Sequence, residues 1–240
     1  MEPVTAPRIC AVIPVLNEQG AIGPTVRQIP RDIVDAVIVV DGGSTDGTVA
    51  EAQSAGALVV VEHRRGYGRA CLTGVEQAAQ LGAELVLFMD GDGADAVEKA
   101  ATLTAPILRG EADFELADRT GGARDPGSMG AHQILAGRLV GAAVGAMTGV
   151  RYRDMCAFRA IRISDLQRLG MQEMGYGWNL EMQIRAARAG LRVREVPMPY
   201  YCRVAGQSKV AGSFSGTVRA GQRILRTLIS VGLAARKPAL

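Results

Sequence analysis

Closely spaced cysteines are missing from this sequence. The four that it has lie far apart, and none forms a Cys-x-x-Cys pair: Cys10, Cys71, Cys156 and Cys202. This spacing excludes a zinc knuckle and the disulfide framework of small secreted proteins. Reduced thiols are typical of the cytosol, so we expect a cytoplasmic protein.

Long hydrophobic runs are missing as well. The longest uncharged apolar stretch, Leu139–Val150, is rich in glycine and alanine and is shorter than the roughly 20 residues that cross a bilayer. The chain starts with no basic segment followed by an apolar core, so a secretory signal is not indicated. We expect no membrane span, and any membrane contact to be peripheral, on the inner face of the cell membrane.

Acidic residues are missing from the last part of the chain, from Val196 to the C-terminus. The same part carries a set of cationic residues, namely Arg203, Lys209, Arg219, Arg223, Arg226, Arg236 and Lys237. This asymmetry indicates an anionic partner. The net charge of the whole chain is only +3, and we expect no nucleic-acid partner.

The composition is that of an ordinary globular protein, 48% apolar and 21% charged over 240 residues, which suits one large domain. Short β-branched runs alternate with helical patterns, which predicts an α/β fold with a mostly parallel sheet flanked by helices. We expect strands at Ile9–Val15, Ala36–Asp41, Ala57–Glu62, Glu84–Asp90, Asp113–Ala117 and about Arg192–Val196. We expect helices at Ala21–Gln28, Asp46–Ala55, Gly68–Leu81, about Ala131–Met147, about Trp178–Ala189 and about Phe214–Leu233.

Polar, glycine-rich segments follow three of these strands, at Asn17-Glu18, Asp41–Gly47 and Asp90–Asp95. The carboxyl ends of parallel strands meet at one edge of a sheet, where ligands bind. We therefore expect the functional residues there. A loop with glycine and proline, Gly121–Gly130, follows the fifth strand, and we expect it to be a mobile lid.

Two carboxylates, Asp90 and Asp92, share a tight turn at the end of an apolar strand. Paired carboxylates suit Mg²⁺ or Mn²⁺, which bridges phosphates and neutralises charge on a leaving diphosphate. An isolated Asp-x-Asp turn is more often a solvated loop. A second acidic, glycine-rich turn at Asp41–Thr48 favours a functional site over a solvated loop. Glu18 alone is also explained as a helix cap.

The order and spacing of these segments resemble family 2 glycosyltransferases of the GT-A fold, nearest to the dolichol-phosphate mannose synthase and bacterial polyprenyl-phosphate glycosyltransferase branch. The resemblance covers nearly the whole chain. The segments that carry it are Ile13–Glu18, Val39–Thr48, Asp90-x-Asp92, Asp154–Arg159, Tyr176–Met182 and Arg203–Lys209. It implies a GT-A domain at 1–212, with a nucleotide-binding half at 1–118 and an acceptor-binding half at 119–212. A C-terminal amphipathic helix and tail follow at 213–240.

The resemblance also implies roles for individual residues. The nucleotide-sugar, a UDP- or GDP-linked donor, would be bound by Pro14, Val15, Asn17, Glu18, Asp41, Gly68, Asp90, Gly91, Asp92, Arg203, Ser208 and Lys209. A cation, Mg²⁺ or Mn²⁺, would be held by Asp90 and Asp92. The acceptor would contact Arg119, His132, Arg138 and Trp178. The expected catalytic residues are Asp92, Arg119, Glu181 and Arg203.

Two positions depart from the family pattern. Gly42 replaces a second acidic residue, and Ala94 stands where related synthases often have a metal-binding glutamine. Asp95 either compensates for the missing ligand or, more simply, caps the following helix.

The expected reaction is inverting transfer of a hexose to an acceptor, for which a polyprenyl monophosphate is favoured. The oxygen of a phosphate is already ionised at neutral pH and needs no base. This agrees with the two histidines, which show no base-and-orienter pairing. An acceptor hydroxyl would need a carboxylate base, and Glu181 is the candidate, with a helix-surface charge as the equal alternative.

The last helix has apolar residues on one side, Phe214, Val218, Leu225, Leu228 and Ile229, and Arg219, Arg223 and Arg226 on the other. Such a helix lies on an anionic membrane surface or packs on the sheet, and the pattern does not choose between the two. Among rival functions, a nucleotidyltransferase lacks its basic first loop here, and a dehydrogenase lacks Gly-x-Gly-x-x-Gly. A non-catalytic nucleotide-sugar-binding protein stays open because of Gly42 and Ala94.

Overall fold

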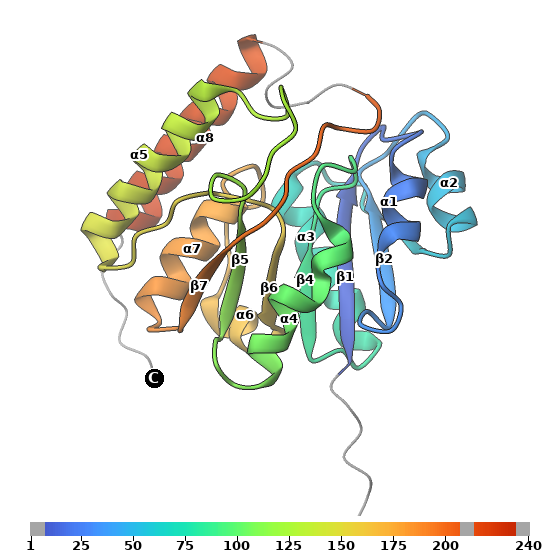
Figure 1. Cartoon of the computed structure of the whole chain (residues 1–240), viewed down its shortest axis with the longest axis horizontal. Helices are drawn as coiled ribbons and strands as arrows, with labels where there is room; N and C mark the ends of the chain where they lie inside the picture. Colours follow the sequence, from blue (N-terminus) through green and yellow to red (C-terminus); the bar gives the residue numbers. More distant parts are fainter. Residues whose placement is uncertain (1–7, 207–213, 234–240) are drawn as a thin grey trace, which may run out of the picture.

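The computed structural model describes residues 8–206 and 214–233, and its centre is a mixed sheet of seven strands in the order β3-β2-β1-β4-β6-β5-β7 (Figure 1). The strands are β1 Ile9–Val15, β2 Ala36–Asp41, β3 Leu58–Val61, β4 Leu85–Phe88, β5 Phe114–Asp118, β6 Arg159–Arg162 and β7 Val193–Pro197. Of these described strands, only β6 is antiparallel to its neighbours, β4 and β5. The predicted α/β fold with a mostly parallel sheet is confirmed.

Helices cover both faces of the sheet. They are α1 Ile22–Gln28, α2 Thr48–Ser54, α3 Tyr67–Gln80, a 3₁₀ turn η1 Val97–Lys99, α4 Ala100–Leu108, α5 Ala131–Thr148, α6 Ile163–Leu169, α7 Trp178–Arg188 and α8 Phe214–Leu233. The last helix packs beside α5 and α7. Within the described residues, no helix combines the length and the apolar character needed to cross a bilayer.

Alternating side chains along the strands build two hydrophobic layers. In β1, Ile9 and Ile13 belong to the layer under α1 and α4, whereas Cys10 and Val12 belong to the layer under α3 and α7. A strand buried on both faces reads as a continuous apolar run. That is why the sequence located β1 and β2 at their observed bounds.

Four elements had no bounds predicted from periodicity, namely η1, α4, α6 and β6. The helix α4 contains Pro106 and follows a 3₁₀ turn, so it lacks a clear start signal. The strand β6 has only two apolar residues between two arginines, and Arg159 is fully buried in it. Its guanidinium donates hydrogen bonds to the carbonyl oxygens of Asn179 and Cys156, which satisfies part of its polar surface without a local sequence signal.

A buried carboxylate in β5 gives a prediction about stability. Glu115 is fully buried, its oxygens accept no hydrogen bond from a described residue, and one lies 3.3 Å from Nε of Arg194. Burial raises the pKa of Glu115 to about 7, and Arg194 offsets this only in part. The folded state therefore holds a proton that the unfolded chain releases above about pH 4.5. Stability from this group is present below that pH and is lost as the pH rises towards 7 and beyond.

We accordingly expect Glu115→Gln to raise the free energy of unfolding by about 1–3 kcal/mol at pH 8 and to leave it nearly unchanged at about pH 4. Urea unfolding of both proteins at the two pH values measures this difference. A variant that is no more stable than the parent at pH 8 would contradict the assignment.

Candidate active site

The polar segments after β1 and β2 meet at the carboxyl edge of the sheet, as expected. Asn17 has a positive φ of 51°, and its Oδ1 accepts a hydrogen bond of 2.8 Å from the backbone N–H of Thr45. The N–H of Asn17 donates to Oγ of Ser44 at 2.8 Å, and the N–H of Glu18 donates to Oγ1 of Thr48 at 2.8 Å. The two strand ends are therefore tied together rather than free in solvent.

The turn after β2 is organised by its own carboxylates. Asp41 is buried, and its carboxylate accepts hydrogen bonds of 3.0 Å from the N–H groups of Gly43 and Ser44. Asp46 accepts one of 3.0 Å from the N–H of Thr48, the first residue of α2. Because the carboxylate of Asp41 accepts hydrogen bonds from its own turn, it fixes the conformation of the loop at the carboxyl end of β2.

The turn after β4 places Asp90 and Asp92 beside β1. Oδ1 of Asp92 accepts a hydrogen bond of 2.9 Å from the N–H of Ala94. A Cβ atom on Gly91 would lie 2.6 Å from Cγ1 of Val15, closer than carbon atoms pack, so only glycine lets the turn lie against the end of β1. This close approach of Gly91 to Val15 explains why both residues lie at the carboxyl edge of the sheet, as predicted.

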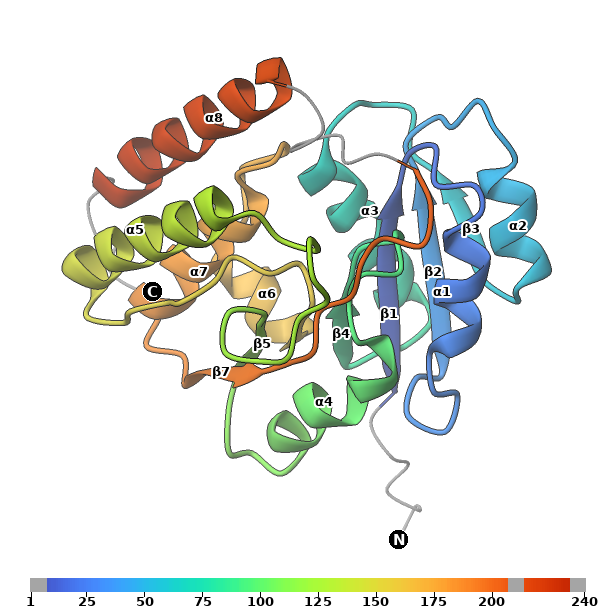
Figure 2. The same ribbon diagram turned by 45° about the horizontal axis from the view of Figure 1, so that its top comes forward.

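The segment 198–206, which follows β7, crosses the ends of β4 and β1 (Figure 2). Backbone hydrogen bonds hold it on both sides. The N–H of Tyr200 donates to the carbonyl oxygen of Ala123 at 2.9 Å, and the N–H of Val204 donates to that of Asp92 at 3.0 Å. We call residues 198–206 the crossing segment. It joins the Asp90–Asp95 turn to the Gly121–Gly130 loop.

The crossing segment brings Arg203 against the carboxylates. Its Nη2 donates to both carboxylate oxygens of Glu18, at 3.0 and 2.9 Å, and its Nη1 donates to Oδ2 of Asp92 at 2.5 Å. Only 26% of the side chain of Arg203 is exposed. A guanidinium paired with two largely buried carboxylates is held firmly. The structure thus places together three residues predicted for donor binding.

The carboxylate cluster favours a cation. Burial raises the pKa of Asp90 well above its usual range, and the charges of Asp92 and Asp95 raise it further. The Asp90 carboxylate accepts no hydrogen bond from a described residue. These are the properties of hard oxygen ligands, so Asp90 and Asp92 fit Mg²⁺ or Mn²⁺. In the described residues no group of three or more potential ligands is arranged to hold a metal, so donor phosphates and water would complete the coordination.

Arg119, at the end of β5, is held by a residue that sequence analysis did not single out. Its Nε and Nη2 donate to the two oxygens of Asp154 at 2.7 and 2.8 Å, and its guanidinium lies 4.9 Å from the ring centroid of Tyr200. The pair fixes the guanidinium while 20% of the side chain stays exposed. No local sequence signal pairs Arg119 with Asp154, because 35 residues separate them.

A cavity of about 400 Å³ lies further along the chain, and Arg119 is not among the residues that line it. It is formed by the Gly121–Gly130 loop and the start of α5, and its lining includes Arg124, Asp125, Met129 and Ile134. The backbone of Arg124 is bridged to Tyr200, on whose ring Arg119 is stacked. Tyr200 therefore links the loop that forms the cavity to Arg119.

Three predicted site residues lie in the interior. Trp178 is fully buried, and a Cβ atom on Gly68 would lie 2.8 Å from its Cε3, so the two pack against each other. Glu181 is also fully buried and accepts hydrogen bonds from Nε of Arg185 at 2.7 Å and from the N–H of Glu173 at 2.6 Å. In this structure Trp178 and Gly68 pack against each other, and Glu181 organises the loop before α7. A saturated, buried carboxylate is not placed to take a proton from an acceptor.

Other predicted residues lie at the periphery or outside the described part of the chain. His132 and Arg138 are exposed on α5 and make no hydrogen bond to the carboxylate cluster among the described residues. Pro14 lies half-buried in β1. Ser208 and Lys209 lie outside the described residues.

Asp95 is neither a helix cap nor a free ligand. Its Oδ2 accepts a hydrogen bond of 3.0 Å from the N–H of Asp90, and its Oδ1 accepts one of 3.6 Å from the thiol of Cys156. No side-chain cap begins η1 or α4. Asp95 instead holds the backbone of the Asp90–Asp95 turn, a role that its position in the sequence does not reveal.

Comparisons with known proteins identify the family and the fold of the chain. The glycosyl transferase family 2 model matches residues 10–169. The chain is 32% identical to glycosyltransferase AglJ of Haloferax volcanii, covering 84% of this chain and 66% of that protein. It is 30% identical to the undecaprenyl-phosphate mannosyltransferase of Micrococcus luteus, covering 87% and 90%.

Among solved structures, a similar fold is found in glucosyl-3-phosphoglycerate synthase of Mycobacterium tuberculosis in complex with Mn²⁺, UDP-glucose and phosphoglyceric acid. It has a TM-score of 0.74 and 24% identity, and the match covers 94% of this chain and 80% of that one. The fold is that of the GT-A glycosyltransferases. With the carboxylate turn, the crossing segment and the family match together, the chain belongs to glycosyl transferase family 2 and is a glycosyltransferase.

Proposed function

We propose that the protein transfers a hexose, with inversion, from a UDP- or GDP-linked sugar to a polyprenyl monophosphate. The observation that carries this proposal is the contact of Arg203 with Asp92 and Glu18 at the carboxyl edge of the sheet. This contact brings an anion-binding guanidinium together with carboxylates that can bind a cation. A nucleoside diphosphate bound with a divalent cation needs both kinds of group.

On the donor side, Asp90 and Asp92 would hold Mg²⁺ or Mn²⁺, which supplies positive charge to the leaving diphosphate. Arg203 would grip the diphosphate and stabilise the charge that develops on it. Support comes from the solved neighbour, which was determined in complex with Mn²⁺ and UDP-glucose. We further propose that Asn17, Glu18 and Asp41 shape the nucleoside side, and that Ser208 and Lys209 extend the phosphate contacts.

On the acceptor side, Arg119 would bind the acceptor phosphate. Its remaining N–H donors make no hydrogen bond to a described residue, and its orientation is fixed by Asp154. The cavity formed by the Gly121–Gly130 loop, which Tyr200 links to Arg119, has the apolar residues Met129 and Ile134 in its lining. An anionic head followed by apolar surface matches a lipid phosphate, and one relative is named an undecaprenyl-phosphate mannosyltransferase.

The burial of Glu181 favours a phosphate acceptor over a hydroxyl acceptor. A hydroxyl needs a base to remove its proton, whereas a phosphate oxygen is already ionised at neutral pH. The candidate base is saturated with hydrogen bonds. The hydroxyl alternative, with Glu181 as base, is therefore the weaker one.

We propose a division of the chain into a nucleotide-binding half at 1–118, an acceptor-binding half at 119–212 and a C-terminal helix and tail at 213–240. The donor residues of β1, β2 and β4 fall in the first half, and Arg119 and the cavity fall in the second. Arg203 is the exception, because the crossing segment returns it to the donor side.

The test is transfer from a panel of radiolabelled UDP- and GDP-sugars to a detergent-solubilised polyprenyl phosphate, with Mn²⁺ or Mg²⁺. We expect one donor to give an organic-soluble product that depends on the cation. Equal transfer to a polyprenyl alcohol would contradict the phosphate acceptor. Transfer only to a water-soluble phosphate, such as a phosphoglycerate, would contradict the lipid.

A further inference from the structure

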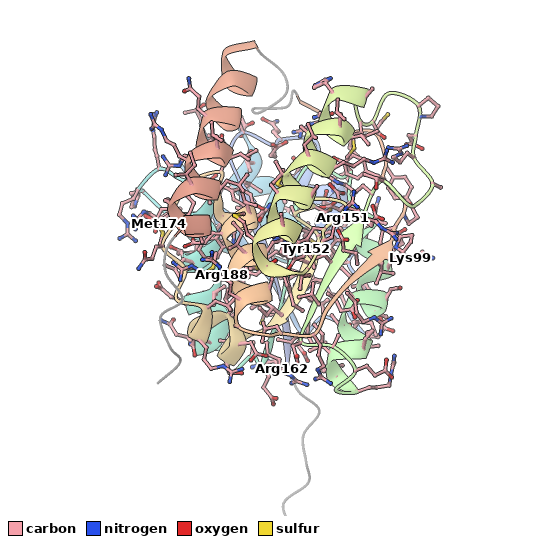
Figure 3. All side chains as sticks on the ribbon, turned by 90° about the vertical axis from the view of Figure 1, so that its left-hand side faces the viewer. Lys99, Arg151, Tyr152, Arg162, Met174 and Arg188 are labelled. Carbon is pink, nitrogen blue, oxygen red and sulfur yellow. The ribbon has the colours of Figure 1, made fainter. Side chains whose placement is uncertain are left out.

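Two helices that lie side by side on the outside of the molecule carry no acidic residue. They are α5 and α8, which contact each other and begin at the same end of the molecule (Figures 1 and 3). Asp and Glu are absent from residues 126–153, which contain α5, and from residue 196 to the C-terminus. This charge distribution is unusual for two neighbouring surface helices, which ordinarily mix both signs.

The outer side of α5 is apolar. Its exposed residues Leu135, Leu139, Ala142 and Ala146 recur at the spacing of one helix face, and the two leucines are 60% and 63% exposed. The opposite side of α5 is buried through Gly137, Gly141 and Val144. The exposed leucines are therefore not needed for packing against the protein.

The helix α8 divides its apolar residues between two sides. Ile224, Leu228 and Val231 pack on the core, and Thr227 is buried. Leu225 and Ile229 are 59% and 52% exposed. The prediction that Leu225, Leu228 and Ile229 lie on one side of the helix is therefore corrected: Leu228 packs on the core, and the other two are exposed.

Arginines accompany these exposed apolar residues. Arg138 on α5 and Arg226 on α8 are exposed, and Arg151, labelled in Figure 3, is exposed just after α5. Arg223 is different, because its guanidinium is paired with Glu173 at 2.6 Å. Exposed leucine and isoleucine with arginine and without carboxylates suit one kind of surface, the boundary between anionic lipid headgroups and acyl chains.

We propose that α5 and α8 together form a docking face for an anionic membrane, defined by Leu135, Arg138, Leu139, Leu225, Arg226 and Ile229. The apolar side chains would enter the headgroup region, and the arginines would contact lipid phosphates. A second copy of the chain is the less suitable occupant, because it would place this cationic face against an identical one. The inference rests on the proposed function, because docking would serve to reach the proposed lipid acceptor. Ile134 lines the acceptor-side cavity, and Leu135 and Leu139 follow it on the same helix.

The experiment is sedimentation of the full chain with phosphatidylcholine vesicles, with and without phosphatidylglycerol, in the absence of donor and acceptor. We expect binding that requires the anionic lipid and weakens as salt is raised. The double variants Leu135→Glu with Leu139→Glu, and Leu225→Glu with Ile229→Glu, are each expected to reduce the bound fraction at least about fivefold.

The matched control is Leu58→Glu with Leu108→Glu, which replaces two exposed leucines outside α5 and α8, at 48% and 39% exposure. It is expected to bind as the parent does, and circular dichroism and thermal unfolding verify that each variant is folded. Undiminished binding by a folded α5 variant overturns the proposal. A parent chain that is dimeric without lipid and monomeric as the α5 variant overturns it in favour of self-association.

Failure of this proposal can be told apart from failure of the proposed function. Vesicle binding is measured without sugar transfer, and transfer to a detergent-solubilised acceptor is measured without vesicles. A chain that transfers sugar to the solubilised lipid but ignores anionic vesicles retains the function and refutes the docking face.

Discussion

Replacing Asp92 by asparagine is expected to lower the rate of sugar transfer at least about 100-fold. The amide keeps the shape of the side chain and an oxygen that can accept the Ala94 N–H, so the turn is preserved. What is lost is the negative charge that Asp92 offers to a cation and to Arg203. A neutral amide is a much poorer ligand for Mg²⁺ or Mn²⁺ than a carboxylate.

Initial rates at saturating cation, compared with the parent, measure this loss. The matched control is Asp32→Asn, an exposed aspartate that precedes β2 at the opposite edge of the sheet, which we expect to leave the rate unchanged. Manganese binding followed by electron paramagnetic resonance gives an independent readout, in which D92N should bind less. A D92N enzyme within about twofold of the parent rate would remove the Asp90–Asp92 pair from the mechanism.

Replacing Arg203 by alanine is expected to have two effects of opposite sign. Transfer should fall at least about 100-fold, because the diphosphate loses the guanidinium that stabilises its charge. In the protein without donor, the same substitution should increase the affinity for Mn²⁺ several-fold, because Arg203 no longer competes for Oδ2 of Asp92. A diphosphate that draws Arg203 away would likewise make the carboxylate available, so donor and cation should bind cooperatively.

The matched control is Arg64→Ala. Arg64 also forms a bidentate pair with a buried carboxylate, Glu62, but it follows β3, which is separated from β4 by β1 and β2. It removes the same charge and should change neither quantity by more than about twofold. Weaker Mn²⁺ binding by donor-free R203A would show that Arg203 helps to hold the cation site together rather than competing for it.

The order of the helices and strands around the donor side followed from the residues alone. Strands β1 and β2 are continuous apolar runs that end in glycine and polar residues, and such patterns act over a few neighbouring residues. The same local pattern is sufficient to place Asp90 and Asp92 at the end of a strand. Parallel pairing then required that end to share an edge with Asn17 and Asp41.

Packing over long distances decided which of these side chains work together. Arg203 reaches Asp92 across 111 positions of the chain, and Asp154 reaches Arg119 across 35. Burial also separated Glu181, which lies in the interior, from Leu135, which lies on the surface, although both belong to helices that the sequence predicts. Helical spacing indicates that a helix has an apolar face, but the surrounding elements determine which face is covered. This is why the burial of Glu181, the exposure of Leu135 and the contact of Arg203 with Asp92 are known only from the folded chain.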